Sequence, residues 1–220
     1  MELRKGSKRS RVALGSAGRV EPPVELVTGT ISADQADSLL RMVQSMPEGP
    51  WLDSNGQDRE EFLTAKYNWI DLPSEGNKIA IPAYLSEHGD LVRESVGLLL
   101  HATGCRKLGR AFINRFSPHS EKGMAPQYVM KPHVDSGRYS AVLSLRPAGS
   151  EGGCLYVSAL AGGELQVRSD LPDTVETRRG KVKQYLGAHG DLMLMRGCDA
   201  GHYVSPTHKM PRYSLVVFGM

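Results

Sequence analysis

Three residues in the second half of the chain have the types and spacing of a metal site. His133 and Asp135 are separated by one residue, and His202 follows in a later apolar segment. In a β-strand, residues i and i+2 point to the same face, so we expect this imidazole and carboxylate to converge. Two histidines and one carboxylate cover one face of an octahedral metal and leave three positions open, as in non-haem Fe(II) sites. We therefore predict an iron site at His133, Asp135 and His202.

Two further histidines compete with His202 for the role of the distal ligand. His189 directly precedes a Gly-Asp turn, and His208 lies only four residues before Arg212. We expect both to be loop residues, which leaves His202 as the third ligand.

The segments around these residues resemble the Fe(II)- and 2-oxoglutarate-dependent oxygenases, especially the prolyl 4-hydroxylase-like branch. The matching segments are KPHVDSGRYSAVLSL, EGGCLYV, GDLMLM and GHYVSPTHKMPRYSLVVFG. They fall within residues 107–220, whereas the N-terminal half matches only in being helical. The resemblance implies a double-stranded β-helix, a cupin-like jelly roll, with iron held by His133, Asp135 and His202.

The same resemblance implies a cosubstrate site at Arg212 and Ser214. Arg212 would pair with the far carboxylate of 2-oxoglutarate, and Ser214, two residues on, would donate a hydrogen bond to it. A planar guanidinium is well suited to bidentate recognition of a carboxylate. Prolyl hydroxylases usually have lysine at this position, so Arg212 resembles other branches. Asp135 disfavours halogenation, because related halogenases have a small residue there.

Other cosubstrate contacts depart from the family pattern. Many relatives have a tyrosine about ten residues before the H-x-D motif, but here Phe116 lies farther back and has no hydroxyl group. Tyr128 or Asn114 could take its place, and we include both as predicted cosubstrate contacts. The tyrosine that relatives have in the strand after H-x-D corresponds here to Ser144.

The elements that must position these residues change type along the chain. Helical periodicity predicts helices over 33–46, after a capping-box pair at Ser32 and Gln35, and over 86–102. Apolar and β-branched runs between turn residues then predict about eight strands, from the candidates 108–116, 128–134, 139–145, 154–160, 165–168, 181–186, 191–195, 202–204 and 213–218.

We expect polar loops at 117–127 and 169–180 and short strands around 62–70. The fold class is therefore mainly β with N-terminal helices, a jelly roll or barrel with helical support.

Charge divides the chain into two parts. Residues 1–20 carry six basic side chains and one acidic one, which leaves 21 of 27 basic and 23 of 24 acidic side chains for the remainder. We predict a flexible basic tail over 1–22 and a single oxygenase domain over 23–220, with helical support over 23–106 and the β-helix core over 107–220.

Composition excludes several classes of protein. The chain has 220 residues, of which 40% are hydrophobic and 23% charged, so it is neither wholly disordered nor a coiled coil. No apolar run approaches the roughly 18 residues of a membrane span, and the charged start does not lead into a secretory signal. Three scattered cysteines do not form a disulfide framework. These features favour a cytoplasmic protein without a membrane partner.

The resemblance implies a dioxygenase that uses Fe(II), 2-oxoglutarate and O2. The preferred substrate is a small molecule, such as an amino acid or a natural-product intermediate, hydroxylated at an unactivated C–H. Alternatives are a peptidyl residue of a protein partner and nucleic acid; the near-neutral domain disfavours the last. A cupin-like module that binds metal without turnover is disfavoured by Arg212 and Ser214. Adjacency in sequence suggests the substrate contacts Arg115, Arg138 and Tyr156.

Overall fold

The computed structural model describes residues 24–45, 52–53, 64–67, 87–116, 132–135, 138–146, 153–159, 163–168, 171–178, 180–196, 201–207 and 210–220. In these ranges lie the two helices α1 (Ala33–Ser45) and α2 (Gly89–Ala102). The strands are β1 (Val24–Val27), β2 (Leu52–Asp53), β3 (Thr64–Tyr67), β4 (Leu108–Phe116), β5 (Tyr139–Arg146), β6 (Leu155–Ser158), β7 (Leu165–Arg168), β8 (Leu171–Thr177), β9 (Val182–Tyr185), β10 (Leu192–Met195), β11 (His202–Val204) and β12 (Arg212–Gly219).

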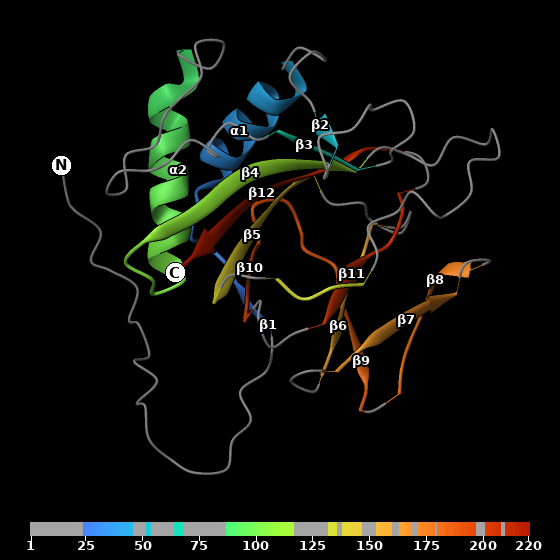
Figure 1. The fold of residues 1–220 in the computed structure, drawn as a ribbon. Helices are drawn as coiled ribbons and strands as arrows, with labels where there is room; N and C mark the ends of the chain where they lie inside the picture. The colour runs from blue at the N-terminus through green and yellow to red at the C-terminus, as the bar shows by residue number, and fades with distance from the viewer. Residues whose placement is uncertain are drawn as a thin grey trace.

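The strands form one large and two small antiparallel sheets (Figure 1). The seven strands of the large sheet have the order β1-β10-β5-β12-β4-β3-β2, and a smaller sheet has the order β11-β6-β9. β7 and β8 pair as a separate two-stranded sheet. The mainly β jelly-roll class predicted from the sequence is confirmed, with the helices ahead of the core strands in the chain.

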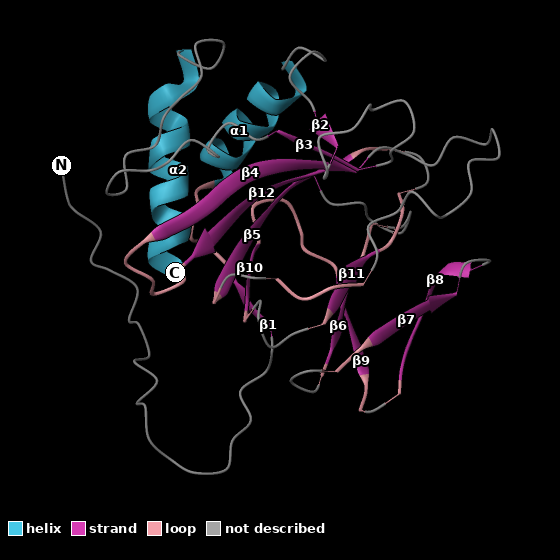
Figure 2. Cartoon of the chain, in the orientation of Figure 1, coloured by secondary structure: helices cyan, strands magenta, loops and turns pink. Residues whose placement is uncertain are grey.

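Both helices pack on one face of the large sheet, and the β11-β6-β9 sheet lies on the other side of the large sheet (Figure 2). Alternation along the strands explains how one sheet serves two layers. On β12, Tyr213, Leu215 and Val217 join the core beneath the helices, whereas Arg212 and Ser214 face a cavity on the opposite side. Arg212 and Ser214 therefore project from a sheet that the helices support from behind.

The predicted helices begin and end close to their expected positions. The backbone N–H of Gln35 donates to Ser32 Oγ at 3.2 Å, as the capping pattern predicts. α2 ends before Gly104, whose φ of +70° is a left-handed conformation that glycine adopts readily. The buried side chains of α1, with Ala36, Leu39 and Val43 among them, have the helical spacing that made this element predictable.

Three strands were not expected, namely β1, β8 and the short β2, which pairs with β3. β1 pairs with the edge of β10, from Val24 opposite Met195 to Val27 opposite Leu192. The prediction of a loop over 169–180 is wrong, because β8 occupies Leu171–Thr177 and pairs with β7. Its sequence lacks an alternating apolar pattern, so the pairing with β7 decides its conformation. The other predicted loop, 117–127, lies outside the described residues.

Candidate metal and cosubstrate site

The two histidines of the predicted triad are joined through their backbones. His133 N–H donates to the carbonyl oxygen of His202 at 3.0 Å, and His202 N–H donates to that of His133 at 2.8 Å. This reciprocal pair is an isolated antiparallel bridge. The side chains of directly opposed residues lie on the same face of a ladder, which places the imidazole centroids 4.3 Å apart. His202 comes from β11, so the small sheet contributes the distal ligand.

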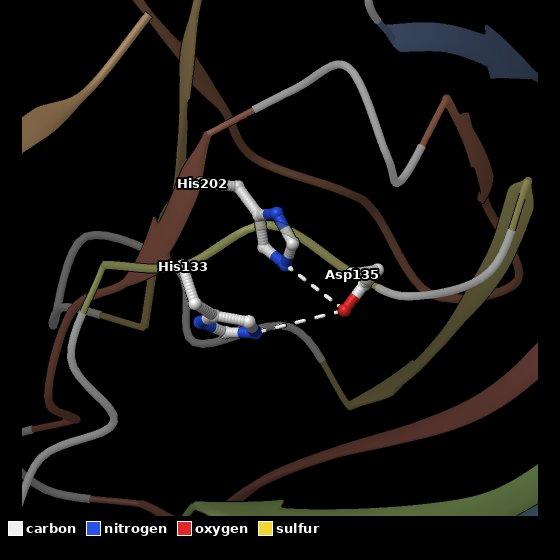
Figure 3. Close-up of side chains that lie close together, drawn as sticks. All are labelled: His133, Asp135 and His202. Atoms are coloured by element: carbon white, nitrogen blue, oxygen red, sulfur yellow. Dashed lines mark ion pairs between the residues drawn. The ribbon is translucent and has the colours of Figure 1, made fainter. Parts of the chain in front are cut away.

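Asp135 completes the triad (Figure 3). Its Oδ1 atom is 3.6 Å from Nε2 of His133 and 3.7 Å from Nε2 of His202. Donor atoms at right angles about a metal, each about 2.1 Å from it, are about 3 Å apart, so small side-chain adjustments would let all three bind one ion. His202 is buried, whereas the side chains of Asp135 and His133 are partly buried, with exposed fractions of 11% and 35%, which leaves one side of the site accessible.

The local reason for this convergence differs from the one predicted. A strand over 128–134 was expected to carry His133 and Asp135 on one face. Among the described residues 132–135, only His133 makes a β-bridge, and Asp135 lies outside any strand. The expectation of a regular strand at this motif is therefore wrong, and a single cross-strand bridge holds the site instead.

Ser140 fixes the orientation of the carboxylate. This fully buried residue of β5 donates a hydrogen bond from Oγ to Asp135 Oδ2 at 2.7 Å. One carboxylate oxygen is thereby engaged, while Oδ1 stays turned toward the two imidazoles. Hydrogen bonds to metal ligands commonly set their orientation and basicity. No sequence motif singles out Ser140; its position in a predicted strand close to Asp135 is the one local signal for this role.

Arg212 lies in the same cavity as the triad. The side chain is 4% exposed, and its guanidinium carbon is 5.2 Å from the ring centroid of Phe116. Within the described part of the chain, no carboxylate forms an ion pair with it. Burial lowers the pKa of Arg212 to about 10, an effect that the nearby Cys154 opposes. Arg212 is thus a buried cation suited to an anionic ligand.

Two polar atoms beside Arg212 also lack partners. Ser214 is directly opposite Asn114 in the pairing of β12 with β4. Both residues line the cavity, and Ser214 Oγ and Asn114 Oδ1 are buried without a hydrogen-bond partner among the described residues. Buried polar groups are normally paired, so these two atoms point to a polar ligand. Two predicted cosubstrate contacts therefore lie next to Arg212, and the third, Tyr128, lies outside the described residues.

Phe116 and Ser144 have roles that the sequence did not indicate. Phe116 lies directly opposite Arg212 in the pairing of β12 with β4, and its ring supports the guanidinium. Ser144 is buried opposite Ser214 and donates to the carbonyl oxygen of Gly187 at 3.4 Å, so this bond ties β5 to a loop. Phe116 has no hydroxyl group, so it does not supply the hydrogen bond that the corresponding tyrosine of the relatives could make.

His189, one of the two histidines that compete with His202, lies away from the triad. His189 is a turn residue whose ring nitrogens contact Asp37 of α1 and the carbonyl oxygen of Leu145, on the helical side of the sheet. His208 lies outside the described residues. Among the described residues, the triad is the one group of metal-binding side chains that comes together.

The suggested substrate contacts do not line the cavity. Arg115 alternates with the cavity-facing Asn114 and Phe116 on β4, and Arg138 packs on the ring of Tyr139. Tyr156 packs with Tyr203 between the small sheets.

Solved structures with a similar architecture include prolyl hydroxylases and an α-ketoglutarate-dependent epimerase. A Pseudomonas putida prolyl 4-hydroxylase matches with a TM-score of 0.53 and 19% identity, over 91% of this chain and 94% of that one. The chain has the fold of the 2-oxoglutarate- and Fe(II)-dependent oxygenases. A Trichoplax adhaerens prolyl hydroxylase, solved with a hypoxia-inducible factor peptide fragment, matches with a TM-score of 0.52 and 13% identity, over 91% and 84% of the two chains.

A third structure with the oxygenase fold is the non-haem α-ketoglutarate-dependent epimerase SnoN of nogalamycin biosynthesis. It has a TM-score of 0.54 and 14% identity, over 89% of this chain and 77% of that one. No family model matches the sequence, and no curated protein sequence matches it. Among the described residues, no helix is long and apolar enough to cross a membrane.

Proposed function

We propose that the chain is an Fe(II)- and 2-oxoglutarate-dependent dioxygenase that hydroxylates an unactivated C–H of a small molecule, such as an amino acid or a natural-product intermediate. The substrate, 2-oxoglutarate and O2 would yield the hydroxylated product, succinate and CO2. The observation that carries this proposal is one cavity of about 530 Å³ that holds both a His-Asp-His triad and a buried arginine with no counter-ion among the described residues. This volume lies in the usual range for small-molecule sites.

The donor atoms fit the two groups that this reaction requires. His133, Asp135 and His202 form the two-histidine, one-carboxylate set that suits Fe(II) and leaves positions open. Arg212, Ser214 and Asn114 offer a cation and two polar side-chain groups to a carboxylate. When bound, iron supplies the oxidising power for C–H hydroxylation, which is driven by oxidative decarboxylation of 2-oxoglutarate.

The residues of this chain would bind 2-oxoglutarate, orient the metal ligands and shield the site from water. Arg212 would hold the far carboxylate of 2-oxoglutarate in a position where water is largely excluded, which strengthens the ion pair. The Phe116 ring limits the directions in which the guanidinium can swing. Ser140 would keep Asp135 in its binding orientation through the bond to Oδ2. In this arrangement, the central step needs no separate acid or base from the protein.

Binding of 2-oxoglutarate to the Mn(II)-loaded protein, measured by calorimetry without O2, tests the cosubstrate site. Truncation of one partner in a buried charge pair costs about 2–5 kcal/mol. Arg212→Ala should therefore weaken 2-oxoglutarate binding by at least about thirtyfold and leave Mn(II) binding nearly unchanged. Ser214→Ala should have a smaller effect in the same direction.

Arg146→Ala is a matched control. Arg146 also places its guanidinium on an aromatic ring, 5.9 Å from the centroid of Tyr213, but Tyr213 belongs to the helix-facing core. This variant should bind 2-oxoglutarate normally. Undiminished binding in Arg212→Ala would move the carboxylate site to another cation, and an absence of succinate release with Fe(II) and O2 would contradict the dioxygenase proposal.

Hydroxylation of a peptidyl residue is the second candidate. It is favoured by the fold similarity to two prolyl hydroxylases, one of which was solved with a peptide fragment. A screen of free amino acids, small organic acids and proline-containing peptides, read out as substrate-dependent succinate release, separates the two candidates.

A further inference from the structure

The cavity has a polar half and an apolar half along the same strands. On β12, the cavity-facing residues run from Arg212 and Ser214 to Val216 and Phe218, a length of about 20 Å. Their partners on β4 are Phe112, opposite Val216, and the charged Arg110, opposite Phe218, whereas the orphaned polar atoms gather near Arg212. Apart from Arg110, the lining on these two strands thus changes from hydrogen-bonding to apolar within one cavity.

The triad lies at the level of the apolar half. Asp135 is bonded to Ser140, and Ser140 is directly opposite Phe218 in the pairing of β5 with β12. A dicarboxylate that joins Arg212 to the metal would therefore extend through the polar half to the triad, and the lining beside the triad at Phe112 and Phe218 would remain available to a substrate. This step rests on the proposed function, because it assigns the polar half to 2-oxoglutarate.

Two phenylalanines form the wall of the apolar half. The rings of Phe112 and Phe218 have centroids 5.6 Å apart and are tilted by 37° to each other. Val134 and Met220 extend this lining to the surface, where they are 54% and 56% exposed. Exposed apolar side chains around a cavity mark a surface that a ligand can cover. A flat apolar group would contact both rings on entering.

One cation accompanies this aromatic wall. Arg110 is exposed, lines the cavity and shares a strand face with Phe112. Apart from Asp135, which belongs to the triad, no acidic side chain of the described residues lines the cavity. The electrostatic field at the entrance therefore favours an anionic group over a cationic one.

We propose that the substrate is a small aromatic carboxylic acid. Its ring would lie against Phe112 and Phe218, and its carboxylate would be directed toward Arg110 at the entrance. Phe218 and Arg110 would then determine substrate choice without holding metal or cosubstrate.

The test uses the full chain loaded with Mn(II) and saturating 2-oxoglutarate in the absence of O2. Broadening of probe proton signals by the bound Mn(II), measured by NMR, reports binding near the metal without turnover. The probes are phenylacetate, 2-phenylethanol, 2-phenylethylamine, acetate and a proline-containing tripeptide. Phenylacetate and 2-phenylethanol share a ring and differ in charge, whereas phenylacetate and acetate share a charge and differ in the ring. We expect phenylacetate to bind most tightly.

Variants separate the contribution of the aromatic contact from that of the charge. Phe218→Leu keeps apolar volume but removes the ring, and should weaken phenylacetate binding at least about threefold. Arg110→Ala should reduce the preference for phenylacetate over 2-phenylethanol by up to about fivefold, and Arg110→Glu should shift the preference toward 2-phenylethylamine. Arg93→Ala, at an exposed arginine of α2 that is bonded to Asp90, is the control and should change neither preference.

The outcomes distinguish this inference from the proposed function. Normal 2-oxoglutarate binding with equal binding of acid, alcohol and amine would overturn the substrate class alone. Tightest binding of the tripeptide would also overturn it, in favour of a peptide substrate. Failure to bind 2-oxoglutarate would overturn the proposed function and, with it, the division of the cavity.

Discussion

Ser140 shows how a residue that does not touch the metal can control a ligand. Ser140→Ala removes the bond to Asp135 Oδ2, which frees the carboxylate to rotate away from the histidines. Loss of such a supporting bond typically costs 10- to 100-fold in metal affinity, so we expect about tenfold weaker Mn(II) binding, measured by calorimetry. Ser140→Thr keeps a hydroxyl group and should recover part of the affinity.

Ser144→Ala is the comparison for this substitution. Ser144 is buried on the same strand and the same face but donates to Gly187. Its loss should lower stability slightly and leave metal affinity unchanged. Equal metal affinities in Ser140→Ala and Ser144→Ala would show that Asp135 does not depend on Ser140.

Arg212 illustrates a stability cost that a binding site imposes. Burial lowers its pKa from the ordinary value of an arginine to about 10, which corresponds to about 3 kcal/mol of unfavourable burial of the charge. Arg212→Met should therefore raise the free energy of unfolding of the ligand-free protein by about 1–3 kcal/mol in urea titrations. The same variant should lose the stabilisation that 2-oxoglutarate confers on the wild-type protein.

The sign of the pH dependence follows from the same pKa. Between pH 5 and 9 the guanidinium is protonated in both the folded and the unfolded state, so its cost does not change with pH in this range. The cost is relieved only as the pH rises past about 10. If the gain in the free energy of unfolding of Arg212→Met varied strongly between pH 5 and 9, another titratable group would be responsible for it.

At the scale of elements, close backbone packing places the start of β11. A Cβ atom at Gly201 would overlap the carbonyl oxygen of Gly163, and the carbonyl oxygen of Gly201 accepts a hydrogen bond from Ser158 N–H. Gly201→Ala must therefore displace backbone next to His202. We expect a loss of about 1–3 kcal/mol in stability, measured by chemical unfolding, together with weaker Mn(II) binding.

Gly97→Ala in α2 provides the contrast, because its added Cβ would meet nothing within 4 Å. Alanine in a helix should leave stability unchanged or raise it by up to about 1 kcal/mol. If Gly201→Ala behaved like Gly97→Ala, the contact with Gly163 would not position His202.

At the scale of the whole molecule, we expect β1 to mark the boundary between the predicted tail and the domain. Val24 is 4% exposed and packs with Met193 and Met195 between the sheets. Deletion of 1–22, which we predict to be a flexible basic tail, should leave the unfolding midpoint and metal affinity nearly unchanged. Deletion of 1–28 also removes β1, exposes the edge of β10, and should lower stability by at least about 2 kcal/mol. Thermal unfolding of both truncated chains tests this, and equal losses would place the boundary elsewhere.

The sequence alone determined the identities of the residues that could do chemistry and the classes of the elements. The spacing of His133 and Asp135, the later His202 and the following Arg212 and Ser214 are visible in the chain. Strand and helix periods are local properties, since they depend on neighbours two to four positions away. For this reason α1, α2 and most core strands were predicted within a few residues.

Tertiary structure decided how those residues meet, because long-range pairing cannot be read from local periodicity. The bridge between His133 and His202 joins positions 69 residues apart, and it replaces the regular strand that was expected at the motif. The ring of Phe116 beneath Arg212 and the bond from Ser140 to Asp135 likewise depend on which strands become neighbours. Each of these contacts arises from the pairing and packing of whole sheets, which the free energy of the complete core selects.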